Sequence, residues 1–349
     1  MKTPPYTRGQ LLPAILEKRI VILDGAMGTM IQRFKLSEAQ YRGERFKDFH
    51  KDIKGNNELL SLTRPDVIQD IHESYLAAGA DLIETNTFGA TTVAQADYDM
   101  AGLAAEMNLA SARIARAACD KFSTPEKPRF VVGALGPTPK TASISPDVND
   151  PGARNTSFEV LRQAYYEQTE ALVKGGSDVL LVETIFDTLN AKAALFAIDE
   201  YFDHSGERLP LIISGTVTDA SGRILSGQTV TAFWHSVRHA EPLAVGLNCA
   251  LGAALMRPYI QELARAAPDT FISCDPNAGL PNPMSDTGFD ETPDVTSRLL
   301  REFADEGLVN IVGGCCGTTP EHIQSIAHAV APLAGRAVQQ RPLFYRQAA

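Results

Sequence analysis

Eight short apolar runs recur along this chain, and they restrict its fold more than any other feature. Each run is continuously apolar rather than alternating with polar residues, which is typical of strands buried on both faces of a parallel sheet. The runs are IVILD (20–24), DLIET (81–85), FVVGAL (130–135), DVLLVET (178–184), PLIISGT (210–216), LAVGLN (243–248), TFISCD (270–275) and LVNIVG (308–313). Amphipathic segments of helical length lie between them, such as VIQDIHESYLAAG and ALMRPYIQELARAA. The alternation predicts an α/β fold, a (β/α)8 TIM barrel that forms a single domain.

The connections between these elements are unequal in length. Links from a helix to the next strand are tight and contain a glycine that can end the helix, as at Gly79, Gly175 and Gly307. Links from a strand to the next helix are long, and three of them run over 25–64, 136–157 and 277–291. Long loops are usually functional, and in a barrel the loops that follow strands share one end. We therefore expect the active site at the carboxyl ends of the strands.

Composition excludes several classes of protein. Of the 349 residues, 44% are hydrophobic and 21% are charged, and the formal net charge is −10. Surfaces that bind nucleic acid or anionic membranes are basic, so neither partner is expected. No apolar run reaches the roughly 18 residues of a membrane span, and no export signal is recognisable at the N-terminus. We expect a soluble cytoplasmic protein with an N-terminal extension (1–19), a barrel (20–331) and a C-terminal tail or linker (332–349).

The five cysteines do not form a disulfide pattern, because the chain is large and shows no export signal. Cys249 follows the sixth apolar run, and Cys315 with Cys316 follows the eighth. In a barrel these strand ends open on the same face, so the three thiols can converge. Three thiolates suit zinc and leave its fourth position open, as in catalytic sites. We expect Cys119, in a helix, and Cys274, inside a strand, to pack in the core.

The glycines around the cysteine pair, Gly313, Gly314 and Gly317, are expected to give the backbone the freedom to aim both sulfur atoms inward. Two other interpretations stay open. The adjacent cysteines could form a strained vicinal disulfide in a thiol redox protein. Alternatively, zinc could serve only to hold a binding module together, although a barrel of this size should not need such support.

Two carboxylates end strands on the same face, Asp24 in ILDGAMGT and Glu183 in LLVETIFD. A buried carboxylate is costly unless it is paired, and the ammonium group of a substrate would satisfy both. The amides of Gly25, Ala26 and Met27, in a tight turn beside Asp24, could bind a carboxylate. These groups together describe a pocket for an amino acid whose far end is a zinc ligand, which suggests a thiol.

The same motifs resemble those of a known family over about residues 20–330. They include LDGAMGTMIQ, KGNNELL, ETNTFGATT, GPTPKTASISPDVNDP, ETIFDTLNAKAA, SGTVTDASGRILSGQT, GLNCALG, PNAGLPNP and NIVGGCCGTTPEHI. The chain is similar to the homocysteine-binding methyltransferase module of cobalamin-dependent methionine synthase. It is more distantly similar to the homocysteine methyltransferases that use betaine or S-methylmethionine.

This resemblance implies roles for particular residues. It implies a zinc site at the three cysteines named above, and it implies that Asp24 and Glu183 hold the amino group of homocysteine. The turn over Gly25, Ala26 and Met27 would bind the substrate carboxylate. Asn248 is expected among the substrate contacts, and Asn277, in PNAGLPN, is expected to occupy the open zinc position until substrate displaces it.

The resemblance also implies a reaction, the zinc-dependent transfer of a methyl group to the thiol of L-homocysteine to form L-methionine. Zinc would remove the thiol proton, and the resulting thiolate would attack the methyl group. The implied donor is methylcobalamin, recharged by methyltetrahydrofolate on other modules. The tail over 332–349 is too short for those modules and the cobalamin motif D-x-H-x-x-G is absent, so we expect a cobalamin-binding module or subunit as partner. The alternative is a stand-alone enzyme that uses betaine or S-methylmethionine.

Overall fold

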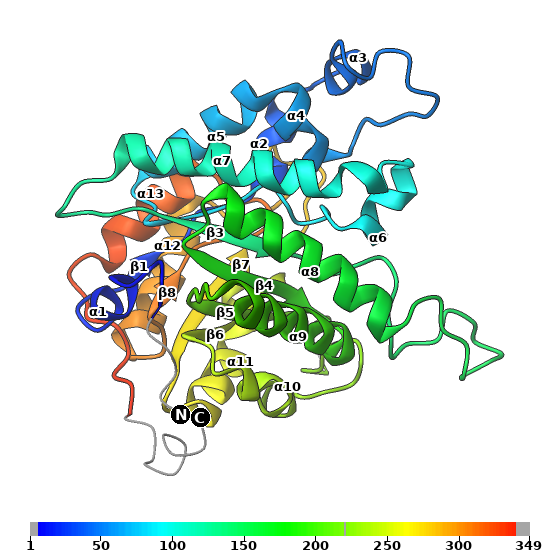
Figure 1. The fold of residues 1–349 in the computed structure, drawn as a ribbon. Helices are drawn as coiled ribbons and strands as arrows, with labels where there is room; N and C mark the ends of the chain where they lie inside the picture. Colours follow the sequence, from blue (N-terminus) through cyan, green and yellow to red (C-terminus); the bar gives the residue numbers. More distant parts are fainter. Residues whose placement is uncertain (1–5, 220, 340–349) are drawn as a thin grey trace.

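The computed structural model describes residues 6–219 and 221–339, and within them it contains the predicted (β/α)8 barrel (Figure 1). The first five residues of the expected N-terminal extension and residues 340–349 of the expected tail lie outside the described part. Eight parallel strands follow one another in the order β1-β8-β7-β6-β5-β4-β3-β2. They are β1 (Val21–Ile22), β2 (Leu82–Glu84), β3 (Phe130–Leu135), β4 (Val179–Ile185), β5 (Leu211–Gly215), β6 (Ala244–Gly252), β7 (Phe271–Asn277) and β8 (Ile311–Val312). All eight lie where the apolar runs predict them.

The barrel closes between β1 and β2, where the contact is short. A parallel bridge joins Leu23 to Leu82. The amide of Asp24 donates to the carbonyl of Leu82 at 3.1 Å, and the amide of Asp81 donates to the carbonyl of Ile22 at 2.8 Å. The Asp81 carboxylate is buried and accepts two 2.8 Å hydrogen bonds from the Arg19 guanidinium. This ion pair therefore stabilises the thinnest part of the barrel wall.

One long helix follows each strand and packs outside the barrel. These helices are α5 (Pro65–Ala78), α7 (Ala104–Phe122), α8 (Phe158–Gly175), α9 (Thr188–Ser205), α10 (Val230–Val237), α11 (Ala253–Ala266), α12 (Pro293–Asp305) and α13 (Pro320–Val330). Within the described residues, no helix combines the length and apolar character that crossing a bilayer requires.

The segment after β1 is not a bare loop. It contains α2 (Met27–Arg33), α3 (Glu38–Arg42) and α4 (Leu60–Thr63), of which α3 and α4 lie at the top of Figure 1. The segment after β2 contains α6 (Thr92–Gln95), which lies at the right-hand side of the same view. A small apolar cluster holds this region together; it consists of Phe46, Ile53, Leu59, Ala90, Met100 and Met107. The long links that follow strands do lie at one end of the barrel, as the sequence predicts.

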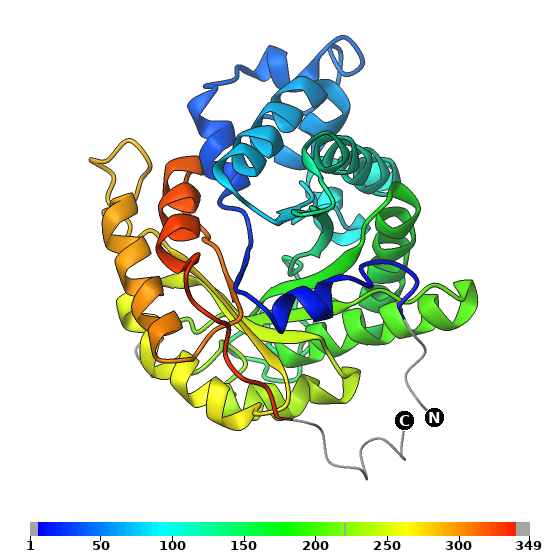
Figure 2. The same ribbon diagram turned by 90° about the vertical axis from the view of Figure 1, so that its left-hand side faces the viewer.

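The other end of the barrel is closed by α1 (Leu12–Leu16), which lies across the opening in Figure 2. Leu12 and Leu16 are almost completely buried and pack against the side chains that fill the barrel interior. Those side chains come from alternate positions of the strands, as expected when successive residues face opposite sides of a sheet. An apolar core therefore fills the half of the barrel that is remote from the long loops.

The interior becomes polar toward the carboxyl ends of the strands. Along β4 the alternate positions read Val179, Leu181 and Glu183, and Glu183 lines the cavity described below. Along β7 the sequence passes from Phe271, which packs on the apolar core, to Asp275, which lines the same cavity. The alternation thus delivers carboxylates to the open end of an otherwise apolar barrel.

Candidate active site

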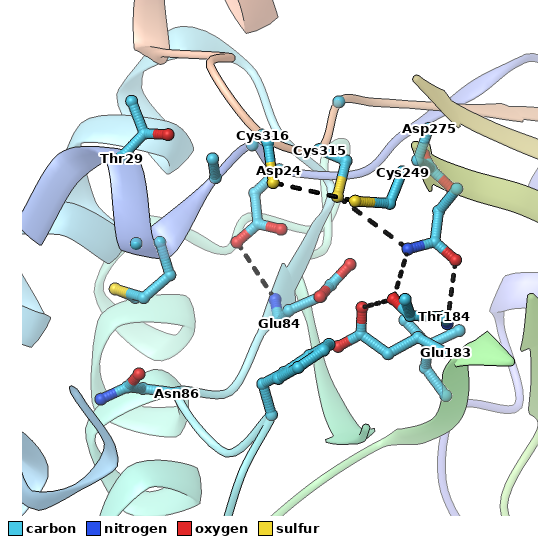
Figure 3. Close-up of a pocket in the computed structure, with 18 of the residues that line it drawn as sticks. Asp24, Thr29, Glu84, Asn86, Glu183, Thr184, Cys249, Asp275, Cys315 and Cys316 are labelled. Atoms are coloured by element: carbon cyan, nitrogen blue, oxygen red, sulfur yellow. Dashed lines mark hydrogen bonds between the residues drawn. The ribbon is translucent and has the colours of Figure 1, made fainter. Parts of the chain in front are cut away.

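A cavity of about 300 Å³ opens at the carboxyl ends of the strands (Figure 3). Its lining comes from strand ends or the loops that follow them, chiefly those of β1, β2, β4, β6, β7 and β8. Nine of the ten residues that the sequence predicts for the site line this cavity, and the tenth, Asn277, accepts a hydrogen bond from the amide of Cys316. The nine are Asp24, Gly25, Ala26, Met27, Glu183, Asn248, Cys249, Cys315 and Cys316.

The three predicted thiols converge in this cavity. The sulfur atoms of Cys249, Cys315 and Cys316 all lie within 4.8 Å of one another. The Sγ atoms of Cys249 and Cys316 are 3.8 Å apart (Figure 3). Ligands held tetrahedrally at about 2.3 Å from a zinc ion stand about 3.8 Å apart, so this spacing suits zinc. The sulfur atoms also suit this metal chemically, because thiolates are soft ligands.

Cys249 reaches the cluster because β6 is irregular at its end. The β6 register with β7 shifts between Asn248 and Gly252, and both Cys249 (φ 61°) and Ala250 (φ 60°) adopt the left-handed conformation. A residue with a β-carbon pays roughly 1–3 kcal/mol for this conformation. The turn aims the Cys249 sulfur across the barrel toward the end of β8.

The adjacent cysteines are held by their backbone. The amide of Cys315 donates to the carbonyl of Pro276 at 2.8 Å, and the amide of Cys316 donates to Oδ1 of Asn277 at 3.1 Å. These contacts fix both residues against the end of β7. The two sulfur atoms consequently face Cys249 without requiring a left-handed residue at either cysteine.

The glycines beside this pair were predicted to give the backbone conformational freedom, and the structure shows a different role for two of them. Only Gly317 has a positive φ, of 80°. A β-carbon on Gly313 would lie 2.8 Å from the carbonyl oxygen of Leu23, and one on Gly314 would lie 2.3 Å from Cγ2 of Thr318. Gly313 and Gly314 are therefore required for close packing against β1 and the following loop, and the prediction for them was wrong in its reason.

Hydrogen bonds among the thiols distribute their protons unevenly. Hydrogen bonds donated by Cys315, and secondarily by Cys316, lower the pKa of the Cys249 thiol. The hydrogen bond to Cys249 raises the pKa of Cys315 and also that of Cys316. The hydrogen bonds within the cluster therefore stabilise the thiolate of Cys249, which is the form in which a cysteine binds a metal.

Five carboxylates line the same cavity, three more than were predicted. Asp24, Glu84, Glu183 and Asp275 are labelled in Figure 3, and the fifth is Glu58. Oδ2 of Asp24 accepts a hydrogen bond from the amide of Glu84 at 3.1 Å, whereas Oδ1 of Asp24 and Oδ1 of Asp275 are buried without a partner in the described structure. None of the described residues that line the cavity is a lysine or an arginine. A cationic ligand would therefore satisfy these groups.

Burial raises the pKa of all five carboxylates, including that of Glu58. It raises the pKa of Asp24 and of Glu84 well above their usual range. Burial, with a contribution from Cys249, raises the pKa of Glu183 to about 7. Burial and the neighbouring Glu183 raise the pKa of Asp275 to about 8. A cation bound beside these carboxylates would favour their ionised forms and so lower these pKa values.

Glu84 and Asp275 were missed in the sequence although the signal was present. Glu84 stands near the end of the run DLIET and Asp275 ends the run TFISCD, as Asp24 and Glu183 end theirs. The same rule, that a carboxylate at a strand end faces the active site, would have found them.

The turn after Asp24 is only partly available to a ligand. The amide of Ala26 already donates to the Thr318 carbonyl at 3.3 Å and to its Oγ1 at 3.2 Å. A β-carbon on Gly25 would lie 2.8 Å from Thr318 Oγ1 and 2.8 Å from the Tyr75 ring, so glycine is required there. A substrate carboxylate at this turn would have to compete with Thr318 for the Ala26 amide.

The other two cysteines lie apart from this cluster, in keeping with core packing. Cys119 is fully buried in α7 among alanines of the core. Cys274 is fully buried in β7, and its Sγ lies 3.6 Å from Sδ of Met256. Burial raises the pKa of both thiols, to about 12 for Cys119. Neither thiol lines the cavity.

Comparison with known proteins agrees with the fold and shows the family. A family model described as homocysteine S-methyltransferase matches residues 21–330. The oxidized form of the Escherichia coli homocysteine methyltransferase MmuM aligns with a TM-score of 0.69 and 19% sequence identity, covering 91% of this chain and 98% of that one. Its metallated form aligns with a TM-score of 0.68 and 20% identity, covering 91% and 99% of the two chains. At these identities the structural likeness establishes the shared barrel.

Proposed function

This chain belongs to the homocysteine S-methyltransferase family and is a methyltransferase, and from that premise we propose that it methylates the thiol of L-homocysteine to give L-methionine in a zinc-dependent reaction. One observation carries the proposal. A single cavity combines three thiols spaced for zinc with five carboxylates, three of them buried, and no described lysine or arginine. Those two halves complement the thiol end and the ammonium end of one amino acid.

Cys249, Cys315 and Cys316 would hold the zinc ion. Zinc, when bound, lowers the pKa of a thiol that joins it, so that the nucleophilic thiolate is available at neutral pH. Three protein ligands leave a position for that thiol. Asn277 stays a candidate for this position in the absence of substrate, since its side chain lies against the amide of Cys316.

The carboxylates would bind the substrate amino group and exclude other substrates. The ammonium group would lie against Asp24 and Glu183, whose neighbours Glu84 and Asp275 add to the negative potential. Because these groups have raised pKa values when the cavity is empty, binding of a cation favours their ionised forms and releases protons. The substrate carboxylate would approach the turn that begins at Gly25.

We propose methylcobalamin rather than an onium compound as the methyl donor, and the lining of the cavity supports this choice. Quaternary ammonium ligands, such as betaine, are commonly recognised by cages of several aromatic rings. Among the described residues lining this cavity, Phe88 is the one aromatic side chain. A volume of about 300 Å³ is also at the lower end of ligand pockets, so a corrin ring would remain at the mouth. We propose that another module or polypeptide presents it there.

The test is to measure zinc content and methyl transfer to homocysteine in the wild type, in Cys316→Ala and in Cys119→Ala. We expect the wild type and Cys119→Ala to contain one zinc and to react, and Cys316→Ala to lose both properties. A fully active, metal-free Cys316→Ala would contradict the proposal. A donor panel of methylcobalamin, betaine and S-methylmethionine decides the second point, because turnover with an onium donor alone would favour the stand-alone alternative.

A further inference from the structure

A chain of hydrogen bonds connects the thiol cluster to the carboxylate that faces it. Nδ2 of Asn248 lies 3.9 Å from Sγ of Cys315 and donates to Oγ1 of Thr184 at 2.7 Å. Oγ1 of Thr184 in turn donates to Oε2 of Glu183 at 3.3 Å (Figure 3). The chain therefore runs from one predicted zinc ligand to one predicted ligand of the substrate ammonium.

The orientation of the Asn248 amide is determined by its neighbours. Oδ1 of Asn248 accepts from the amide of Thr184 at 3.0 Å and from Oγ of Ser214 at 2.7 Å. A backbone amide can only donate, so Oδ1 must face Thr184 and the two N–H groups must face Thr184 Oγ1 and the Cys315 sulfur. Both lone pairs and both N–H groups of this buried side chain are then used. Asn248 consequently has no freedom to rotate without losing a contact.

The backbone conformation of Thr184 is unfavourable and is stabilised by contacts with Asn248. The φ angle of Thr184 is 52°, which is unfavourable for a β-branched residue, and the register between β4 and β5 shifts around it. Asn248 forms hydrogen bonds with both the backbone amide and the hydroxyl group of Thr184. Glu183 immediately precedes Thr184 in the same irregular segment of β4.

We propose that Asn248 is a positioning residue that fixes the distance between the zinc site and the ammonium site, and that it thereby selects the length of the amino-acid thiol. Homocysteine has one methylene more than cysteine, so a rigid spacing would accept the longer substrate and leave cysteine unable to reach both ends. This inference rests on the proposed function, since it assumes zinc at the thiols and an amino acid in the cavity.

Three variants test this chain of hydrogen bonds. Asn248→Asp keeps the shape and the acceptors for the Thr184 amide and Ser214 but replaces Nδ2 with an oxygen, so that the donors to Cys315 and to Oγ1 of Thr184 are both lost. Thr184→Val keeps the branched shape but removes the hydroxyl that joins Asn248 to Glu183, and Thr184→Ser restores that hydroxyl. Cys274→Ala, on the adjacent strand β7, is the control, because it changes a buried residue that takes no part in this chain of hydrogen bonds.

The measurements are zinc affinity by competition with a chelator and calorimetric binding of homocysteine and cysteine to the zinc-loaded proteins. For Asn248→Asp we expect zinc affinity to fall about 10- to 100-fold, as is usual when a partner of a metal ligand is removed. For Thr184→Val we expect near-normal zinc affinity and a preference for homocysteine over cysteine reduced about tenfold, with recovery in Thr184→Ser. Thermal unfolding confirms that each variant is folded.

Two results would overturn the inference. One is an Asn248→Asp protein that binds zinc as tightly as the wild type and the Cys274→Ala control. The other is an identical homocysteine-to-cysteine ratio in Thr184→Val and Thr184→Ser. In both cases a wild type that binds zinc and homocysteine leaves the proposed function standing, whereas a wild type that binds neither refutes the function itself.

Discussion

Replacing Glu183 by glutamine should stabilise the empty protein and weaken the binding of homocysteine. The Glu183 carboxyl is buried, and burial raises its pKa from the usual 4.5 to about 7. Each tenfold change in proton affinity corresponds to 1.36 kcal/mol, so holding the ionised group in the cavity costs about 3 kcal/mol. Glutamine has the same shape, still accepts from Thr184 and has no charge to bury.

The pH dependence of this effect has a definite sign. Because the folded-state pKa is higher than the unfolded one, protonation favours the folded state. The wild type therefore has the full contribution of this group below about pH 4.5 and loses it as the pH rises through about 7. The gain in unfolding free energy for Glu183→Gln should be about 3 kcal/mol at pH 8 and should vanish near pH 4. Denaturant unfolding of the metal-free proteins measures it, with the exposed Glu126→Gln as control.

Substrate binding should respond in the opposite direction. A hydrogen bond between charged groups is worth about 1.5–3 kcal/mol, so homocysteine should bind about 10- to 150-fold more weakly to Glu183→Gln. The matched ligand is 4-mercaptobutanoic acid, which is homocysteine without its amino group, and the substitution should leave its binding unchanged. If both ligands lose affinity equally, Glu183 is not the ligand of the ammonium group. If the variant is no more stable than the wild type at pH 8, the ionised Glu183 does not lower the stability of the protein.

Three further perturbations test other parts of the structure. Gly314→Ala would place a β-carbon 2.3 Å from Thr318, so we expect a loss of about 1–3 kcal/mol of stability and weaker zinc binding. The control is Gly102→Ala, where an added β-carbon has no neighbour within 4 Å, and it should change neither stability nor zinc binding. Asp81→Asn removes the charge that pairs with Arg19 at the barrel seam and should lower the unfolding free energy by about 2 kcal/mol; an unchanged thermal midpoint would contradict the role given to this pair. Removing zinc with a chelator should abolish methyl transfer while circular dichroism still shows a folded barrel, because the apolar core is independent of the cavity, and unfolding would instead favour a structural metal.

The barrel and the convergence of its cysteines were predictable because both follow from local patterns. Continuous apolar runs indicate buried parallel strands, and eight of them close into a barrel whose strand ends share one face. Cys249 stands immediately after such a run, and Cys315 and Cys316 follow another run within three residues. Their positions relative to the strands were therefore enough to predict that the three cysteines meet, although two of them are far from the third along the chain.

The backbone at the site could not be predicted in the same way. Left-handed residues are usually glycine, which is why Gly313 and Gly314 were expected to make the turn. The structure instead has left-handed conformations at Thr184 and Cys249, while Gly314 is selected by contact with Thr318. Tertiary contacts such as those of Asn248 with Thr184 impose these conformations, and no pattern in the neighbouring residues reports them.

The division of the barrel into an apolar half and a polar half explains how such a site can persist. Left-handed residues with a β-carbon and buried, unpaired carboxylates each cost free energy, of the order of 1–3 kcal/mol for each strained residue. The strained Thr184 and Cys249 lie at the carboxyl ends of β4 and β6, whereas Leu12 and Leu16 close an apolar core at the opposite end. The strained residues and the apolar core therefore lie in different halves of the barrel. For this reason the unfavourable free energy at the cavity does not disturb the core packing, whose favourable free energy offsets it. A cation and a metal that fill the cavity would remove much of that cost, so binding free energy and site strain are linked through the same few residues.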